Sequence, residues 1–281
     1  MNIREVINKE KIKLLENNIE DALIIEKILM QYVLKKQESY IITNCDEELD
    51  NDKIKEYEKY INKVIMGTPI QYITNNQEFM KLQFYVDENV LIPQPDTEIL
   101  VEEVIKESMK FSNRIDIMDL CTGSGAIGIS LAKYINSSKI LCTDISMKAL
   151  QIAKLNAEKN LVHRKMEFIL SDLFENIIDK KFDIIVSNPP YIKTSVIKKL
   201  DKQVQNEPII ALDGGTDGLD FYRVISNEAD MFLKDNGILF LEIGYDQKEE
   251  VMKLLESQNI YKSIECKKDL SKNDRVIIAR K

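Results

Sequence analysis

The stretch Asp119-Leu120-Cys121-Thr122-Gly123-Ser124-Gly125 joins a short apolar run at residues 115–120 to a segment with helical periodicity near residues 126–136. Gly123 and Gly125 allow the backbone to turn tightly, and they let a ligand approach where a Cβ would otherwise stand. Ligands of open α/β sheets bind outside the carboxyl ends of the strands, and this turn follows such an end. The stretch therefore predicts a strand–turn–helix unit that contacts a ligand.

Further apolar runs alternate with helical segments along the rest of the chain. We expect strands at residues 140–143, 168–170, 182–187, 238–243, 263–266 and 275–279. Helices are expected near residues 146–160, where Ser146 is a suitable N-cap, and at residues 248–258. Alternating strands and helices, with nearly continuous apolar strands, predict a doubly wound, mainly parallel sheet that helices cover on both faces.

The N-terminal third has a different pattern. Ile54, Tyr57 and Ile61 share one helical face, and the helix that they predict ends before Gly67 and Pro69. Residues 22–33 are apolar around most of a helical circumference, which predicts a central helix. We therefore expect a small helical domain over residues 1–69.

A linker should follow this helical domain. Phe84 and Val86 alternate with polar residues, residues 87–89 resemble a turn, and Val90 and Ile92 resume the apolar pattern. This alternation predicts a β-hairpin linker within residues 70–95. The remaining residues, 96–281, should form the α/β domain, which begins with a helix from about Thr97.

Acidic residues follow the next two strands after the glycine turn. Asp144 stands 19 positions past Gly125, which suits a carboxylate that binds the two hydroxyls of a ribose. Asp172 follows the third strand and is placed to meet an adenine amino group, with Leu173 against the ring. A nucleoside-containing cofactor is therefore expected. The turn suits either NAD or S-adenosylmethionine, although the extra carboxylate of Asp119 favours a cationic aminoacyl-sulfonium tail.

The tetrapeptide Asn188-Pro189-Pro190-Tyr191 directly follows the fourth apolar strand. Two prolines make this segment stiff and leave carbonyl oxygens without competing N–H donors. The side-chain oxygen of Asn188 is a further acceptor. Together they could hold both hydrogens of a planar NH₂ group, while Tyr191 packs against its flat face. Such a clamp stabilises a nitrogen that loses planarity as it is alkylated.

Composition excludes several classes of protein. The chain has 281 residues, with 39 basic and 47 acidic side chains, and this net charge of −8 disfavours binding to nucleic acid through phosphate contacts alone. No apolar run is long enough to cross a bilayer, and the charged N-terminus does not resemble a signal peptide. The four scattered cysteines indicate reduced thiols, so we expect a cytoplasmic protein. His163 is the single histidine, so a multi-histidine metal site is impossible and we expect no metal. We expect no catalytic role for His163, because holding and alkylating an NH₂ group needs no imidazole.

With both motifs placed, the chain resembles the release factor glutamine methyltransferases, the PrmC/HemK family. The resemblance covers nearly the whole chain, and Asn-Pro-Pro-Tyr alone is shared with adenine-N6 methyltransferases. The segments that carry it are residues 71–73, 77–79, 91–98, 119–125, 188–191, 207–208, 214–219, 242–245 and 273–276.

This resemblance implies a Rossmann-like seven-stranded class I methyltransferase sheet with the last strand antiparallel. It implies methyl transfer from S-adenosylmethionine to the side-chain amide of the glutamine in the Gly-Gly-Gln motif of class I peptide chain release factors. The helical domain would help to dock the release factor. The implied cofactor residues are Asp119, Cys121, Thr122, Gly123, Ser124, Gly125, Asp144, Asp172, Leu173 and Asn188, and Asn188, Pro189, Pro190 and Tyr191 would hold the glutamine amide.

Some positions depart from the family pattern. Cys121 stands where glycine is more common, Gln94 and Asp96 stand where arginine and glutamate are, and Asn75 replaces a glycine. Asparagine still tolerates a left-handed backbone. None of these departures falls within the Asn188–Tyr191 tetrapeptide.

Other functions use the same residues in part. An adenine-N6 methyltransferase acting on nucleic acid would use the same tetrapeptide, but the acidic charge disfavours it. An NAD-dependent oxidoreductase would use the glycine turn and would leave residues 188–191 without a role. A release-factor-binding protein without activity would not need the tetrapeptide. We expect a monomer whose partner is a release factor, with no direct binding to nucleic acid or membranes.

Overall fold

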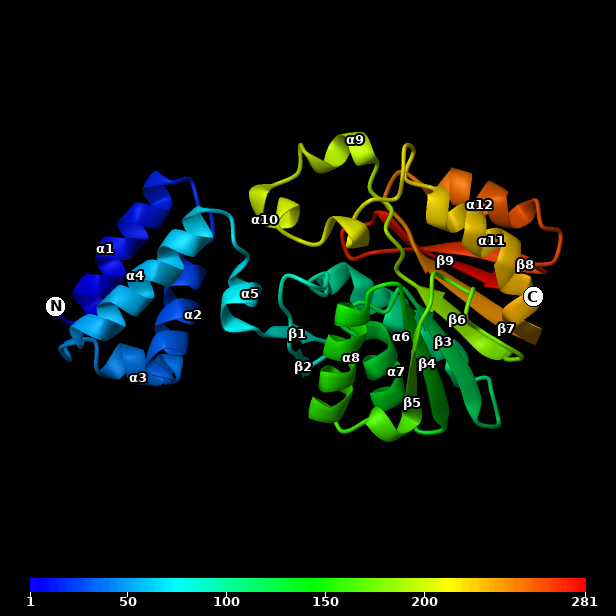
Figure 1. The fold of residues 1–281 in the computed structure, drawn as a ribbon, viewed down its shortest axis with the longest axis horizontal. Coiled ribbons are helices and arrows are strands. Elements are labelled where there is room, and N and C mark those ends of the chain that lie inside the picture. The colour runs from blue at the N-terminus through cyan, green and yellow to red at the C-terminus, as the bar shows by residue number, and fades with distance from the viewer. The chain divides into compact units, whose positions relative to one another are not determined.

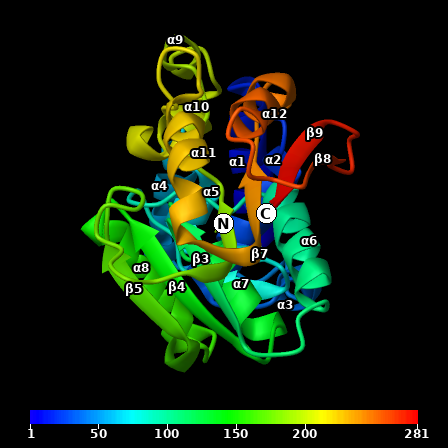
Figure 2. The same ribbon diagram turned by 90° about the vertical axis from the view of Figure 1, so that its right-hand side faces the viewer.

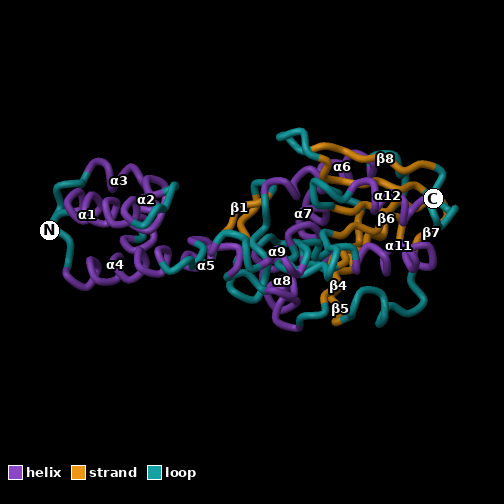
Figure 3. The backbone as a smooth tube through the Cα atoms, turned by 90° about the horizontal axis from the view of Figure 1, so that it is seen from above, coloured by secondary structure: helices purple, strands orange, loops and turns teal.

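The computed structural model describes all residues, 1–281, and divides them into two compact units. The first unit contains Met1–Asn75 together with Asp201–Asn206, and the second contains Asn76–Leu200 together with Glu207–Lys281. The first is wholly helical, whereas the second combines helices and strands (Figure 3). None of the helices has the length and hydropathy that crossing a membrane requires.

The first unit is a small helical bundle (Figure 1). Tyr57 and Ile61 are fully buried in its apolar core, and the Tyr57 hydroxyl donates to the Glu26 carbonyl at 3.1 Å. Asn206 closes the unit by donating from Nδ2 to the Gly67 carbonyl at 2.9 Å. Its helices are α1 (Ile3–Glu16), α2 (Ala22–Leu34), α3 (Glu38–Thr43), α4 (Asn51–Ile65), α5 (Ile70–Thr74) and α10 (Lys202–Gln205).

The helix α2 is central, as its apolar circumference predicted, because it contacts α1, α3, α4 and α5. Its packing is nevertheless one-sided. Leu29, Met30 and Val33 are buried, whereas Leu23, Ile24 and Ile28 are exposed. This helix therefore has more apolar side chains than the core of the bundle buries.

The second unit contains a seven-stranded sheet with the order β5-β4-β3-β6-β7-β9-β8. The strands from β5 to β7 are parallel, and β9 runs antiparallel to both of its neighbours. This confirms the predicted methyltransferase sheet with an antiparallel last strand. Its strands are β3 (Ile115–Leu120), β4 (Ser138–Asp144), β5 (Met166–Leu170), β6 (Phe182–Ser187), β7 (Leu233–Glu242), β8 (Ser263–Lys268) and β9 (Asp274–Arg280).

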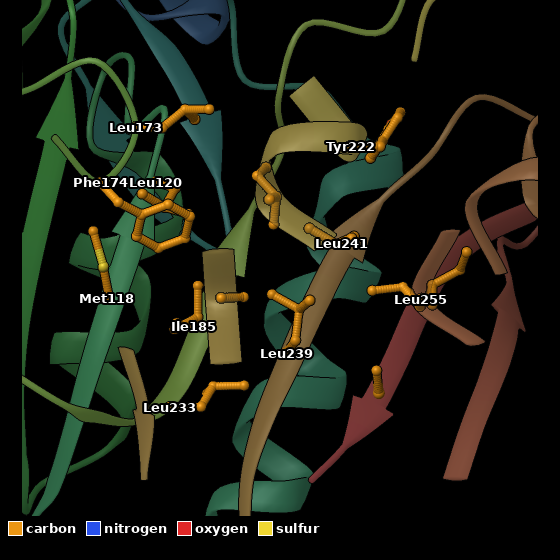
Figure 4. Packing of buried hydrophobic residues seen from close by; sticks show 14 of the residues in the cluster. Met118, Leu120, Leu173, Phe174, Ile185, Tyr222, Leu233, Leu239, Leu241 and Leu255 are labelled. Carbon is orange, nitrogen blue, oxygen red and sulfur yellow. The ribbon is translucent and has the colours of Figure 1, made fainter. Parts of the chain in front are cut away.

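Helices cover both faces of this sheet (Figure 2). The helices α6 (Glu98–Ser108), α7 (Ala126–Tyr134) and α8 (Met147–Lys159) follow one another across one face, and Ser146 caps α8 as expected, accepting from the Ala149 N–H at 3.2 Å. The opposite face packs against α11 (Asp220–Phe232) and α12 (Lys248–Glu256). Figure 4 shows part of this second core, where Ile185 and Leu239 are paired neighbours on β6 and β7.

The linker contains a hairpin, but at a different place from the predicted alternation. It pairs β1 (Gln77–Phe79) with β2 (Leu82–Phe84) through a turn at Met80 and Lys81, both with positive φ. Residues 85–94 form no strand, so the expected pairing across residues 84–92 was wrong. The reason is that a side chain replaces a partner strand: Asn156 accepts from the Tyr85 N–H at 2.7 Å and donates to the Tyr85 carbonyl at 2.9 Å.

The strand register brings several loops to one edge of the sheet. Leu120 pairs with Thr143 on one side and with Ser187 on the other, so β3, β4 and β6 end together. The chain runs from β3 outward through β4 and β5, and then returns to β6 on the other side of β3. This reversal is the topological switch point at which open α/β sheets bind their ligands. Short helices complete the unit: η1 (Pro95–Thr97), η2 (His163–Lys165), α9 (Thr194–Ile197) and η3 (Ile209–Ala211).

Candidate functional site

A cavity of ≈ 310 Å³ opens at this switch point, beyond the carboxyl ends of β3, β4, β5 and β6. Its volume lies within the range of sites for small molecules and cofactors. The residues that line it are Asn89, Val90, Leu91, Cys121, Gly123, Asp144, Ile145, Ser146, Ala149, Ser171, Asp172, Leu173, Asn188, Pro190, Ile210, Ala211, Asp220, Phe221 and Val224.

Some of the predicted cofactor residues line the cavity, and the others lie outside its lining. The ones that line the cavity are Cys121, Gly123, Asp144, Asp172, Leu173 and Asn188. The others, Asp119, Thr122, Ser124 and Gly125, belong to the same turn but lie outside the cavity lining. The first set can touch a ligand directly, whereas the second set shapes the turn.

The glycines of the turn have separate physical roles. Gly123 has a φ of +54°, and a Cβ built on it would meet no atom within 4 Å. Its bare Cα therefore leaves open space beside the cavity. A Cβ on Gly125 would lie 2.8 Å from Ile129 Cδ1, and a Cβ on Gly128 would lie 2.7 Å from Cys142 Sγ. A side chain on Gly128 would therefore crowd Cys142 and Asp119, and Gly125 suits its position because its φ is +82° and a Cβ there would lie 3.1 Å from Ala153 Cβ of α8.

Asp119 organises the turn from below. It is fully buried, and its Oδ2 accepts from the Thr122 hydroxyl at 2.6 Å and from the Gly128 N–H at 2.9 Å. Burial raises the pKa of Asp119 to about 7, although these two hydrogen bonds act in the opposite direction. Asp119 lies outside the cavity lining, so it does not contact a ligand directly, and its hydrogen bonds hold the turn that does.

Asp144 joins the turn to the cavity. Its Oδ2 accepts from the Gly123 N–H at 2.9 Å, and its Oδ1 accepts from the Ser146 N–H at 2.8 Å. Burial raises the pKa of Asp144, and these backbone donors oppose that shift. Each carboxylate oxygen has a second lone pair, so both can also accept from neighbouring hydroxyls of a ligand. Asp144 therefore has the chemistry and the position of a ribose-binding carboxylate.

The Asn188–Tyr191 tetrapeptide forms the opposite wall of the cavity. Asn188 and Pro190 line it, whereas Pro189 and Tyr191 do not. Tyr191 packs against the apolar cluster under α11 and α12, and burial raises the pKa of its hydroxyl. Side-chain and backbone acceptors of Asn188 and Pro190 can therefore face a ligand, while the Tyr191 side chain contacts the core.

Segments distant in sequence hold this tetrapeptide. A Cβ on Gly214 would lie 2.7 Å from Tyr191 Cα, and a Cβ on Gly218 would lie 2.4 Å from the Tyr191 carbonyl oxygen. Gln247 Nε2 donates to the Tyr191 and Gly218 carbonyls, each at 3.0 Å. The glycines of residues 214–218 are therefore needed so that this loop can lie directly against the tetrapeptide backbone.

Sequence reasoning missed several residues of the site. Val90, Leu91 and Ile210 line the cavity; Val90 was assigned to an apolar strand pattern, and Ile210, in η3, was assigned no role. Glu207 joins these loops because its Oε2 accepts from the Ile92 N–H at 2.8 Å, and burial raises its pKa to about 7. Phe221 lines the cavity from the first turn of α11. Leu91 and Glu207 belonged to segments of the family resemblance, which could have indicated their place.

His163, for which no catalytic role was expected, lies outside the cavity lining. His163 begins the 3₁₀ helix η2 and is exposed. Cys45, Cys121, Cys142 and Cys266 are all free thiols, and no group of acidic, cysteine and histidine side chains is arranged to hold a metal ion. Of the four cysteines, only Cys121 lines the cavity.

The chain is similar to two families over separate parts. The PrmC N-terminal domain family matches residues 5–74, and the methyltransferase small domain family matches residues 94–200. Among solved structures, a methyltransferase from Pyrococcus furiosus is similar with a TM-score of 0.53 at 15% identity, with 79% of this chain and 98% of that chain covered. At this identity the likeness shows the fold alone.

Curated relatives are similar over nearly the full length. A release factor glutamine methyltransferase of Clostridium acetobutylicum is 44% identical over 282 residues, which cover 99% of this chain and 98% of the relative. A protein with the same name from Clostridium botulinum is 42% identical over 258 residues, which cover 91% of this chain and 90% of the relative.

Proposed function

Since the chain belongs to the family of release factor glutamine methyltransferases, we propose that it transfers a methyl group from S-adenosylmethionine to the side-chain amide nitrogen of the glutamine in the Gly-Gly-Gln motif of class I peptide chain release factors. One observation carries this proposal. A single cavity is lined on one side by Gly123 and Asp144, and on the other by Asn188 and Pro190. A nucleoside-containing donor and a planar amide can therefore meet within it.

The residues on the first side suit S-adenosylmethionine. The bare Cα of Gly123 leaves space for a ligand, and Asp144 has lone pairs for ribose hydroxyls. Asp172 and Leu173 line the cavity beyond β5, where they suit an adenine. When bound, this donor supplies a methyl group whose bond to the sulfonium sulfur breaks as the bond to the amide nitrogen forms.

The tetrapeptide binds the amide that accepts the methyl group. The side-chain oxygen of Asn188 and a proline carbonyl accept the two hydrogens of the glutamine NH₂ group. These hydrogen bonds strengthen as the nitrogen loses its amide conjugation and gains positive charge, so they stabilise the transition state more than the ground state. The nitrogen then loses one proton, which water can accept. No imidazole is required, which agrees with the position of His163 outside the cavity lining.

We further propose that residues 1–69 form the release-factor docking domain, residues 70–95 the linker, and residues 96–281 the catalytic domain. The match of the PrmC N-terminal domain family to residues 5–74 supports a dedicated role for the first of these parts. A substrate that takes part in translation also implies activity in the cytoplasm.

Mass spectrometry of a purified release factor tests this function. After incubation with the protein and S-adenosylmethionine, the peptide that carries Gly-Gly-Gln should gain the mass of one methyl group, located on the glutamine. A release factor with alanine in place of that glutamine is the matched control and should gain nothing. Methylation of DNA or ribosomal RNA instead would overturn the proposal in favour of an adenine-N6 methyltransferase.

The cofactor assignment has its own test. Asp144→Ala should weaken binding of S-adenosylmethionine by at least about tenfold, because the ribose loses a charge-assisted acceptor pair. Isothermal titration calorimetry measures this directly. A dissociation constant that does not change would show that Asp144 does not bind the ribose, and NAD that binds more tightly than S-adenosylmethionine would favour an oxidoreductase.

A further inference from the structure

The side chain of Asn188 contacts a buried polar pair behind the cavity wall. Asn188 Nδ2 donates to Thr97 Oγ1 at 3.2 Å. Thr97 directly precedes α6 and is 4% exposed, and Glu242 ends β7 and is 2% exposed. Both residues belong to segments of the family resemblance that the reaction has so far left without a role. Neither lines the cavity, so neither can touch the substrate.

Opposing influences act on the ionisation of Glu242. Burial is the largest of them and raises its pKa to about 7, whereas hydrogen bonding from Thr97 and the positive charge of Arg275 act in the opposite direction. The negative charge of Asp96 raises the pKa further, and hydrogen bonding from Asn188 lowers it by the smallest amount. Arg275 is itself held in place, because its Nη2 lies 3.1 Å from Asp96 Oδ2 and 3.0 Å from Asp269 Oδ2.

These neighbours select one end of the Asn188 amide. The Thr97 hydroxyl accepts from Asn188 Nδ2, and Glu242, while it is ionised, can only accept hydrogen bonds. Thr97 therefore binds the nitrogen of Asn188, and the ionised form of Glu242 favours the same orientation. Since Asn188 also lines the cavity, its carbonyl oxygen Oδ1 remains for the ligand.

We propose that Thr97 and Glu242 are positioning residues that hold the Asn188 amide in the orientation that presents its oxygen, and not its nitrogen, to the substrate. This inference rests on the proposed function. An asparagine amide turned by 180° has almost the same shape, so packing alone discriminates poorly between the two orientations. The turned amide would place an NH₂ group against the NH₂ group of the glutamine, and the acceptor needed in the transition state would be lost.

Removal of the Thr97 hydroxyl tests the proposal. Thr97→Val keeps the shape and removes the hydrogen bond, whereas Thr97→Ser keeps the hydroxyl. We expect Thr97→Val to lower kcat for release factor methylation by about tenfold, with the dissociation constant of S-adenosylmethionine within about twofold of its original value. Thr97→Ser should recover most of the rate. Ser130→Ala removes another buried hydroxyl, which bonds only within α7, and it should leave kcat unchanged.

Two further measurements separate positioning from general loosening of the fold. In an Asn188→Ala background, Thr97→Val should change kcat by less than about twofold, because the residue through which it acts is absent. In ¹⁵N-labelled protein without cofactor, the side-chain NH₂ signal of Asn188, assigned by its absence in Asn188→Ala, should exchange slowly with solvent. This exchange should become faster in Thr97→Val and in Glu242→Gln.

The outcomes distinguish this inference from the function on which it rests. Rapid exchange of the Asn188 NH₂ group in the unaltered protein, or exchange that neither variant changes, would overturn the positioning role even if release factor is methylated. The positioning role would also be overturned if Thr97→Val lowered kcat by the same factor in the unaltered protein and in the Asn188→Ala background. Slow exchange of the Asn188 NH₂ hydrogens that becomes faster in both variants supports the positioning role. If release factor is not methylated in that case, only the proposed function is refuted.

Discussion

The two walls of the cavity are held in different ways. On the wall formed by the turn after β3, the supporting hydrogen bonds join residues that are close in the sequence. Thr122 donates to Asp119, 3 positions away, and Gly123 donates to Asp144, 21 positions away. On the wall formed by the tetrapeptide after β6, the supporting hydrogen bonds join residues that are far apart in the sequence: Asn188 donates to Thr97, 91 positions away. Gln247 reaches the Tyr191 carbonyl over 56.

This difference shows how each wall obtains its rigidity. The turn is built by one βαβ unit, so its geometry forms together with that unit. The tetrapeptide contains two prolines and is stiff in itself, but its orientation depends on the loop at residues 214–218, on α12 and on the segment before α6. Substitutions on the first wall should therefore act mainly on cofactor affinity, and substitutions around the second wall mainly on the rate.

The largest effect should come from the tetrapeptide itself. Asn188→Ala removes an acceptor that binds most tightly in the transition state, so we expect kcat to fall by about 10²–10³, as when one oxyanion-hole donor is lost. Affinity for S-adenosylmethionine should change much less. Single-turnover methylation of release factor and calorimetry measure the two quantities. Turnover close to that of the unaltered protein would show that Asn188 does not hold the amide.

Two glycines offer a matched comparison of the walls. Gly214→Ala would place a Cβ 2.7 Å from Tyr191 Cα and 2.9 Å from the Pro190 carbonyl, so it should displace the tetrapeptide and lower kcat by at least about tenfold. Gly123→Ala meets no protein atom and should instead raise the dissociation constant of the cofactor. Kinetic and calorimetric data on both variants test the division. The distinction between a wall that controls cofactor affinity and a wall that controls the rate is wrong if both variants change only kcat or only the dissociation constant of the cofactor.

Buried carboxyls on both walls should make stability depend on pH. The pKa values of Asp119, Glu207 and Glu242 are each raised to about 7. Between pH 8 and pH 6 these groups gain protons in the folded state while the unfolded chain stays ionised. The free energy of unfolding should therefore rise on acidification by about 1 kcal/mol per group, and it should fall again as the pH rises through 7.

Urea unfolding at pH 8 and at pH 6 measures this dependence. Asp119→Asn, beneath the turn after β3, and Glu207→Gln, which removes the carboxylate that binds the Ile92 N–H, should each reduce the difference in unfolding free energy between the two pH values by about 1 kcal/mol. Equal stability of the unaltered protein at both pH values would show that these carboxyls do not titrate in this range.

The smallest effect concerns Cys121, the departure from glycine within the turn. Its φ is +58°, a left-handed conformation that costs a non-glycine residue about 1–2 kcal/mol. Glycine loses more chain entropy on folding, so Cys121→Gly should raise the free energy of unfolding by at most about 1 kcal/mol. Denaturant titration measures the change. A clear loss of stability would indicate that the thiol packs usefully against the core.

Much of the fold follows from local patterns. Apolar runs predicted the strands, Ser146 predicted the start of α8, and the glycine turn predicted the passage from β3 to α7. The seven-stranded sheet with its antiparallel last strand agrees with the family resemblance. The hairpin was misplaced because the Asn156 side chain, and not a strand, satisfies the backbone of Tyr85.

Local chemistry is therefore sufficient to place the glycine turn, Asp144 and the Asn188–Tyr191 tetrapeptide each directly at the end of a strand, because hydrophobic period and turn residues are properties of short segments. Which of these strands are neighbours is decided by the order of the sheet. It is not sufficient to show that Asp119 lies beneath the turn, or that Tyr191 faces the core. It also cannot reveal that Thr97 and Glu242 meet the Asn188 amide. The contacts of Asn188 and Tyr191 depend on packing between distant segments, with 91 positions between Thr97 and Asn188 and 56 between Tyr191 and Gln247. The burial of Asp119 depends on how the turn and α7 fold over its side chain, which the residue types alone do not specify.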